Sequence, residues 1–362
     1  MNFFNHLSHY FSNRDTFQEI ILIPVIATFL AISLGLLLLI VSGSSSEIAL
    51  KALIALFAGS FGSLSAISET LTAATPLIFA ALGIAIGFRA GLFNIGAEGQ
   101  IILGGMAAVV IGFSFQLPFF LHLILLLLVG ALLGGFYAFI SGWLKAVTGA
   151  HEVITTIMLN LIAYRLLDFF LRISWIQKEG RNDPISKSIF ETAELPKILN
   201  FLDPNLRIHM GFLIAIIAVI IVYWLIFHTT IGYEFRAVGK NLDASKYGGI
   251  NSSMTIILAM SMAGLLAGLA GASQIAGVLG RATPSFSGGI GFDAIAVALL
   301  GRAHPIGVLF AGILFGVLIA GGREMQVSAD VSLDLITVIQ ALIIIFIAAP
   351  ILIRKLFPWI FK

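Results

Sequence analysis

The sequence predicts an all-α, polytopic membrane protein with about ten transmembrane helices, some of them broken or re-entrant. Hydrophobic residues make up 59% of the 362 positions and charged residues only 10%, whereas a soluble domain carries about 25% charged residues. A chain so poor in polar side chains cannot cover a water-facing surface. Its apolar runs also lack the alternating pattern of β-strands, which leaves helices as the spanning structure.

The composition excludes several classes of function. Lysine and arginine number 20 against 18 aspartates and glutamates, so the basic excess that nucleic-acid binding needs is missing. The chain has no cysteine, which excludes disulfides, thiolate nucleophiles and zinc–thiolate sites. The sequence contains neither a phosphate-binding P-loop motif nor a spaced cluster of metal ligands. We therefore expect a chain that is not itself an enzyme and that holds no cofactor or metal.

Each predicted helix corresponds to one apolar run. The first run, residues 20–41, is too long for the core of a signal peptide, and we interpret it as a retained span. Residues 47–68 are interrupted by a lysine, glycines and serines, which predicts an interfacial or half-buried segment. The remaining runs are 76–88, 101–115, 119–144, 153–171, 210–227, 254–275, 289–300, 306–320 and 333–353. Several of these runs are short and rich in glycine, as broken or re-entrant helices are.

Pairs of glycines spaced four residues apart occur within several runs. Such pairs stand at 83/87, 130/134, 264/268 and 312/316. This spacing places small residues on one face of a helix and predicts close contact between helices.

The positions of lysine and arginine set the orientation, because cytoplasmic loops carry an excess of these residues. The rule places both tails, residues 1–19 and 354–362, in the cytoplasm, with a transmembrane domain at 20–353 between them. Loop 172–209 is then extracellular and loop 232–250 cytoplasmic. Six basic residues in loop 172–209 are nearly balanced in charge by acidic residues. Long loops are also translocated across the membrane with less regard to their charge.

A dense group of polar residues lies between two apolar runs at residues 89–100. It contains Asn94, Glu98 and Gln100 among three glycines. Such groups are costly in hydrocarbon and face a bundle interior or a water-filled cavity. Two interpretations stay open: the three side chains line a translocation path, or Arg89 and Glu98 form an ion pair that holds a broken helix.

A second polar group follows helical spacing. Glu152, Thr156 and Asn160 fall on one helix face. This face is turned towards a pore or a partner subunit, or it hydrogen-bonds to neighbouring helices. Asp293, which precedes an apolar run, is expected to cap the start of a helix.

The cytoplasmic loop 232–250 contains the signals of a short helix. Asn241 supplies a helix start and the Gly248–Gly249 pair a helix stop. A short helix at the cytoplasmic face suits docking to a partner protein, although the pattern alone favours an ordinary connection between helices.

This loop resembles the coupling loop of ATP-binding-cassette (ABC) importer permeases of the ribose, nucleoside and branched-chain amino-acid type. The matching residues are Arg236, Ala237, Gly239, Asn241, Ala244, Gly249 and Ile250. Segments 55–63, 75–78, 88–100, 151–160 and 289–301 resemble the nucleoside branch of that group. The resemblance runs in order from about residue 55 to 320, and the run 93–100 is its most specific part.

The resemblance implies a permease subunit in a bacterial plasma membrane, with a fold like that of the vitamin B12 importer. Its expected partners are a second permease of similar type, a cytosolic ATPase that uses ATP and Mg²⁺, and an extracellular lipoprotein that delivers the nucleoside. The substrate path would include Asn94, Glu98, Gln100, Glu152 and Asn160. The ATPase would dock on Arg236, Gly239, Asn241, Ala244 and Gly249, with Arg236 reaching the edge of its groove.

Three alternatives remain at this stage. The substrate of the importer could be a simple sugar or a branched-chain amino acid. A proton-coupled secondary transporter could use Glu98 and Glu152 as proton relays. A purely structural membrane subunit is the third.

Overall fold

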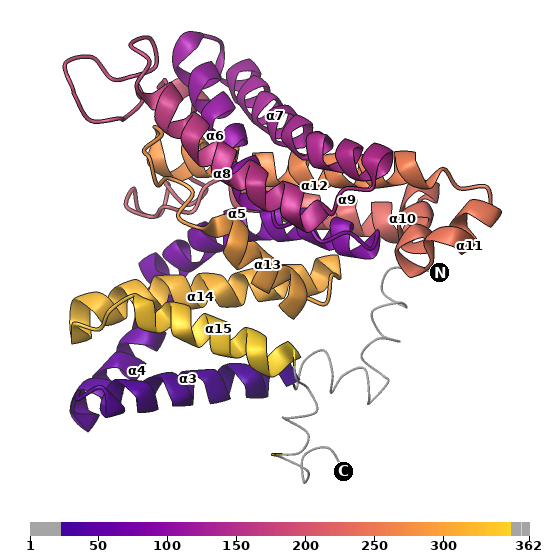
Figure 1. The fold of residues 1–362 in the computed structure, drawn as a ribbon. Helices are drawn as coiled ribbons and strands as arrows, with labels where there is room; N and C mark the ends of the chain where they lie inside the picture. The colour runs from indigo at the N-terminus through magenta and orange to yellow at the C-terminus, as the bar shows by residue number, and fades with distance from the viewer. Residues whose placement is uncertain (1–22, 349–355, 357–362) are drawn as a thin grey trace.

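The computed structural model describes residues 23–348 and residue 356, and this part of the chain is built from helices (Figure 1). Within it, eight helices are long and apolar enough to cross a membrane. They are α3 (Ile23–Val41), α5 (Leu64–Arg89), α6 (Ala97–Ser114), α7 (Phe119–Thr148), α8 (Glu152–Leu171), α9 (Gly211–His228), α12 (Ser252–Gln274) with the π-turn η3 (Ile275–Leu279), and α14 (Pro305–Ala329).

Shorter helices complete the described structure. They are α4 (Ser46–Phe61), the 3-10 turn η2 (Glu191–Ala193), α10 (Thr230–Lys240), α11 (Leu242–Tyr247), α13 (Ile290–Leu300) and α15 (Asp334–Ala348). The predictions for the tails 1–19 and 354–362, and for the outer ends of runs 20–41 and 333–353, fall outside the described residues, apart from residue 356.

The expected apolar runs are confirmed as helices, with one difference near the N-terminal end. Residues 47–68 form two elements instead of one segment, because α4 ends at Phe61 and α5 already begins at Leu64. Ser63 starts α5 by accepting a hydrogen bond from the Ala66 N–H at 3.0 Å. The polar residues of this first part of α5 hid the helix from hydropathy. Ser68 among them is nevertheless only 2% exposed.

The glycine pairs of α7 and α12 face each other, as their spacing predicted. A Cβ atom on Gly134 would lie 2.5 Å from the Gly264 carbonyl oxygen and 2.6 Å from the Gly268 Cα. Only glycine lets the two backbones come this close. Helices α5 and α6 lie beside this pair at the centre of the bundle, with 83% and 78% of their apolar windows buried.

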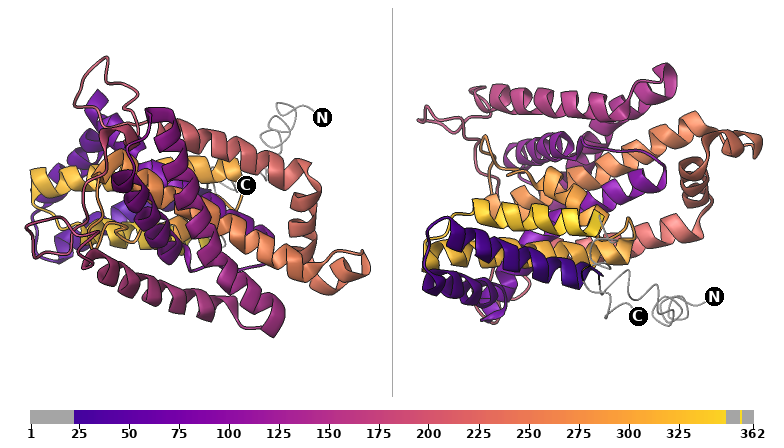
Figure 2. Two further views of the ribbon diagram at one scale, coloured as in Figure 1. Left: turned by 90° about the horizontal axis from the view of Figure 1, so that it is seen from above. Right: turned by 60° about the horizontal axis from the view of Figure 1, so that its bottom comes forward.

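The two long hydrophilic segments lie at opposite ends of the bundle. In Figures 1 and 2, α10 and α11 project from one end, whereas the connection from α8 to α9 occupies the other. That loops 172–209 and 232–250 lie on different sides of the membrane stays a prediction.

The α8–α9 connection is folded against the bundle. The Ser68 hydroxyl of α5 accepts hydrogen bonds from the N–H groups of Arg207 and Ile208, each at 2.8 Å. The Arg207 guanidinium also forms an ion pair with Glu69 at 3.2 Å. His209 follows, 1% exposed, with its ring against Gly277 of the π-turn.

His209 is expected to make the protein less stable in acid. Burial of the imidazole, reinforced by the charge of Arg207, lowers the pKa of His209 to about 4 from its ordinary value near 6.5. Above pH 6.5 the ring is neutral in the folded and the unfolded chain. As the pH falls from 6.5 to 4 the unfolded chain binds the proton first, so the free energy of unfolding decreases, by at most about 3 kcal/mol.

The measurement is the thermal unfolding midpoint in detergent at pH 7.5 and pH 4.5, for the wild type and for His209→Gln. The variant carries no titratable ring, so its midpoint should fall less over this interval. Equal losses in the two proteins would show that His209 does not carry the effect.

Candidate functional site

The turn between α5 and α6, residues 90–96, is the meeting point of the predicted path residues. Asn94 shapes it, because its Oδ1 accepts a hydrogen bond from the Gly96 N–H at 2.9 Å. The carboxamides of Asn94 and Gln100 also exchange two hydrogen bonds of 3.1 Å. Both side chains are buried, at 1% and 2% exposure. Their hydrogen-bonding groups are directed at the turn and at each other.

Asn160 fastens this turn to α8. Its Oδ1 accepts from the Gly99 N–H at 2.8 Å, and its Nδ2 donates to the Ile95 carbonyl at 2.9 Å. A carboxamide can donate and accept at once. One side chain therefore holds the end of the turn and the first turn of α6 together.

Glu98 joins three helices. Its Oε1 accepts from the Tyr164 hydroxyl of α8 at 3.0 Å and from the Gly289 N–H at 3.3 Å, and its Oε2 accepts from the Gly291 N–H at 2.7 Å. The carboxylate is fully buried. It lies at the N-terminal ends of both α6 and α13, where the helix dipoles stabilise a negative charge.

This arrangement corrects the expectation for Asp293. The N-cap position of α13 is Gly289, which has no side chain to cap the helix, and Asp293 lies within the first turn. The N–H groups at the start of α13, which lack a partner within the helix, donate instead to Glu98 from another helix. A Cβ atom on Gly291 would overlap the Glu98 backbone, so glycine is what allows this approach.

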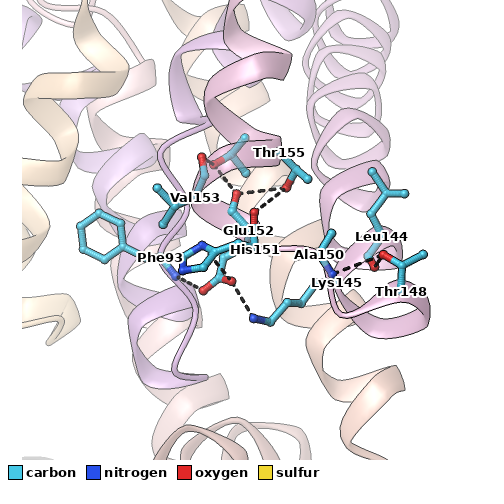
Figure 3. A network of polar contacts seen from close by, with 10 residues as sticks. Phe93, Leu144, Lys145, Thr148, Ala150, His151, Glu152, Val153 and Thr155 are labelled. Carbon is cyan, nitrogen blue, oxygen red and sulfur yellow. Dashed lines mark hydrogen bonds and ion pairs between the residues drawn. The ribbon is translucent and has the colours of Figure 1, made fainter.

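Glu152 connects the turn to the start of α8 (Figure 3). Its Oε2 forms an ion pair with the Lys145 ammonium at 2.8 Å, and its Oε1 accepts from the Phe93 N–H at 3.4 Å. The ring Nδ1 of His151 is 3.9 Å from the same carboxylate. Arg89, which the sequence offered as a partner of Glu98, donates its Nε to the Ala303 carbonyl at 2.9 Å.

The structure thus brings all five predicted path residues around one turn, each buried and bonded to the chain itself. Sequence reasoning missed Tyr164, Lys145 and the N–H groups of α13. Tyr164 was within reach, because it lies one helical turn after Asn160 on the polar face of α8. The bonds of backbone N–H groups cannot be predicted from residue types, because nearly every residue has such a group.

The predicted coupling residues divide into two groups. The short helix is confirmed: α11 begins after Asn241, whose Oδ1 accepts from the Ala244 N–H at 2.9 Å, and ends at Gly248. Asn241, Ala244 and Gly249 are exposed at this end of the molecule, as is Tyr247 at 96%. We call residues 241–250 the α11 tip.

Arg236 is half-buried, and Gly239, although exposed, lies against another segment of the chain. The Arg236 guanidinium donates to the Ile226 carbonyl and lies 5.5 Å from the centre of the Phe227 ring. A Cβ atom on Gly239 would lie 2.8 Å from the Gly91 nitrogen, so α10 contacts the α5–α6 turn backbone to backbone. The contact of Arg236 with a partner's groove stays a prediction beside these contacts within the chain.

Comparison with known proteins places these features in a family. The profile of the branched-chain amino acid transport system / permease component family matches residues 66–348. The chain is 38% identical to the guanosine ABC transporter permease protein NupP of Bacillus subtilis, over 92% of this chain and 94% of that protein. It is also 38% identical to the nucleoside ABC transporter permease protein NupB of Lactococcus lactis, over 93% of each.

A third relative is the glucose ABC transporter permease protein TsgB13 of Haloferax volcanii, 36% identical over 78% of this chain and 75% of that protein. Each of these three organisms also has a second permease that matches the chain, at 27% or 28% identity. No solved structure matches the chain.

Proposed function

The chain belongs to the branched-chain amino acid transport system / permease component family, and from this membership we propose that it is a transmembrane subunit of an ABC importer of nucleosides. One observation carries the choice of substrate. The guanosine and nucleoside permeases match at 38% identity over almost the whole chain, whereas the match to the glucose permease covers 78% of it. A sugar importer is therefore the second candidate.

The proposed path runs beside the turn 90–96. In this proposal Asn94, Glu98, Gln100, Glu152 and Asn160 act on the path by fixing the N-terminal ends of α6, α8 and α13 around it. Polar groups at helix ends within the membrane are the usual setting for a substrate site in transporters. Direct contact with substrate would follow an opening of these hydrogen bonds during the transport cycle.

The proposed partners are a cytosolic ATPase, a second permease and an extracellular binding lipoprotein. The exposed α11 tip supports an ATPase contact, because ATP hydrolysis elsewhere can move this chain only through a surface whose contacts change between states. The paired relatives in three organisms support a second, distinct permease of the same family. In this arrangement ATP and Mg²⁺ bind to the ATPase.

We further propose the vitamin B12 importer type of fold, with about ten helices in the membrane. The eight candidate spans would be joined there by the shorter apolar helices α13 and α15. The membrane is the bacterial plasma membrane, with both termini in the cytoplasm.

Radiolabelled uptake tests the substrate and the energy source together. Cells that lack the gene are compared with cells that carry it, using labelled guanosine and labelled glucose. We expect gene-dependent guanosine uptake that stops on ATP depletion and persists when the proton gradient alone is collapsed. Uptake of glucose only would establish the sugar importer, and loss with the proton gradient alone would establish the secondary transporter.

The orientation is tested by labelling an introduced cysteine, since the chain has none of its own. Ser188 is exposed in loop 172–209, so Ser188→Cys should react with a membrane-impermeant maleimide in intact cells. Thr148→Cys, exposed at the other end of the bundle, is the control and should react only after permeabilisation. The reverse pattern would invert the proposed orientation.

A further inference from the structure

Helix α8 has an outer face that the described chain leaves largely uncovered. Only 22% of its apolar window is buried, as in α3, and it packs mainly against α6 and α7. Its buried side chains lie on one side and include Thr156, Asn160, Ala163 and Leu167. The opposite side exposes a stripe at helical spacing: Ile154, Met158, Leu161, Ile162, Arg165 and Phe169. We call this stripe the outer face of α8.

Arg165 sets this face apart from those of α3, α7 and α9, whereas the exposed Arg323 of α14 pairs with Glu69. It follows Glu152 by 13 residues, or about 20 Å along the helix, and six further helical residues come after it. The exposed positions of α3 and α7 carry no charged side chain, and those of α9 carry none before its terminal His228. Those faces suit lipid, whereas an arginine within a span requires a protein partner, water or access to the headgroups.

The charge on this face also has no partner among residues 23–348. Among the described residues, the side chains of Arg165 and Asp168 form no hydrogen bond or ion pair, with each other or with neighbours. Asp168 is half-buried three positions beyond the arginine. The helix thus presents a positive and a negative group, offset by less than one turn, at the border of an apolar stripe.

We propose that the outer face of α8 is the contact surface for the second permease, and that a carboxylate of that subunit pairs with Arg165. This inference rests on the proposed function, in which a second permease completes the importer. A related subunit could carry a basic and an acidic residue at the corresponding positions of its own helix. Its acidic residue would then pair with Arg165 and its basic residue with Asp168. The apolar residues of the stripe would supply the packing area around this pair, and burial between subunits would exclude lipid from the guanidinium.

The first test measures subunit association. The tagged chain is co-expressed with the ATPase and with the second permease of the same organism, and the complex is purified in mild detergent. Arg165→Leu should lower the amount of second permease per tagged chain at least ten-fold, because it leaves the partner's carboxylate unpaired, and Arg165→Lys should restore most of it. Arg172→Leu, at an exposed position just beyond α8, is the matched control and should retain the partner.

The second test locates the contact without altering the charge. Single cysteines replace Met158 on the outer face of α8 and Ile217 on the exposed face of α9, and each carries a benzophenone photocrosslinker. We expect an adduct with the second permease from Met158→Cys and lipid adducts alone from Ile217→Cys.

Three outcomes would overturn the inference. If Arg165→Leu keeps its partner and Met158→Cys labels lipid, the arginine reaches the headgroups. If the variant keeps its partner but needs more guanosine for half-maximal uptake, the guanidinium faces the substrate. If the wild-type chain imports guanosine but never co-purifies with a second permease, the proposed interface is wrong although the proposed function is right. If the wild-type chain shows no ATP-dependent uptake, the proposed function itself is wrong.

Discussion

Gly239→Val is expected to reduce ATP-dependent uptake to the level of cells without the protein. The α-carbon of Gly239 lies against the backbone of Arg89–Gly91, and an added Cβ would come within 2.8 Å of the Gly91 nitrogen. Valine cannot enter this space unless α10 moves away from the α5–α6 turn. Overpacking of this kind costs about 1–3 kcal/mol, and here it also separates the coupling segment from the turn that holds the path residues.

Ala244→Arg is expected to remove uptake by a different route. Ala244 is exposed on the α11 tip and lies in the first turn of α11, where its N–H bonds to the Asn241 cap. Arginine there should leave the thermal unfolding midpoint unchanged and displace the ATPase. Gly239→Val should lower the midpoint as well. The measurements are uptake, the unfolding midpoint in detergent and the amount of ATPase that co-purifies.

Gly248→Ala is the matched control for both changes. Its Cβ would lie 3.4 Å from the nearest carbonyl oxygen, an ordinary contact, so uptake should stay near that of the wild type. Wild-type uptake by Gly239→Val would show that α10 need not touch the turn, and wild-type uptake by Ala244→Arg would rule out the α11 tip as the docking surface.

Glu98→Ala is expected to lower the free energy of unfolding by about 1–3 kcal/mol, because the buried Gly291 N–H loses its acceptor, with a smaller loss at the part-buried Gly289 N–H. We expect the Glu98→Ala variant to lose uptake as well. Glu98→Gln should have a smaller effect on stability, since one carboxamide oxygen still accepts while its NH₂ group faces a donor.

A graded series checks that the acceptor is what matters. Tyr164→Phe removes one of the three donors and leaves the two N–H groups bonded, so it should cost only about 1 kcal/mol. The measurement is denaturant or thermal unfolding in detergent, with insertion level followed by immunoblot. A Glu98→Ala protein as stable as the wild type would contradict the capping role.

Local signals in the sequence predicted several parts of this structure correctly. The α11 helix follows from Asn241 and the Gly248–Gly249 pair, whose capping and stop chemistry act within a few residues. The contact between α7 and α12 follows from glycines at four-residue spacing. The polar face of α8, from Glu152 to Asn160, follows from helical periodicity, and it does meet the polar group at 94–100.

Features that depend on distant partners could not be predicted. Glu98 caps α13 by accepting hydrogen bonds from backbone N–H groups. No side chain in the sequence indicates where these N–H groups find their acceptor. Whether Gly239 permits a turn or a close approach depends on the segment beside it, which the sequence does not reveal. The start of α5 was missed because glycines and serines interrupt the apolar run 47–68, although Ser68 is buried and accepts hydrogen bonds from two distant N–H groups.

The link between Glu98 and α13 has a consequence for how the chain is made. The carboxylate and the Gly291 N–H are 193 residues apart, and a ribosome adds about 5–20 residues per second. Roughly 10–40 s therefore separate the synthesis of α6 from that of its partner helix. During this interval Glu98 lacks the α13 donors. We therefore expect α6 to stay near the insertion machinery or the water interface until α13 is made.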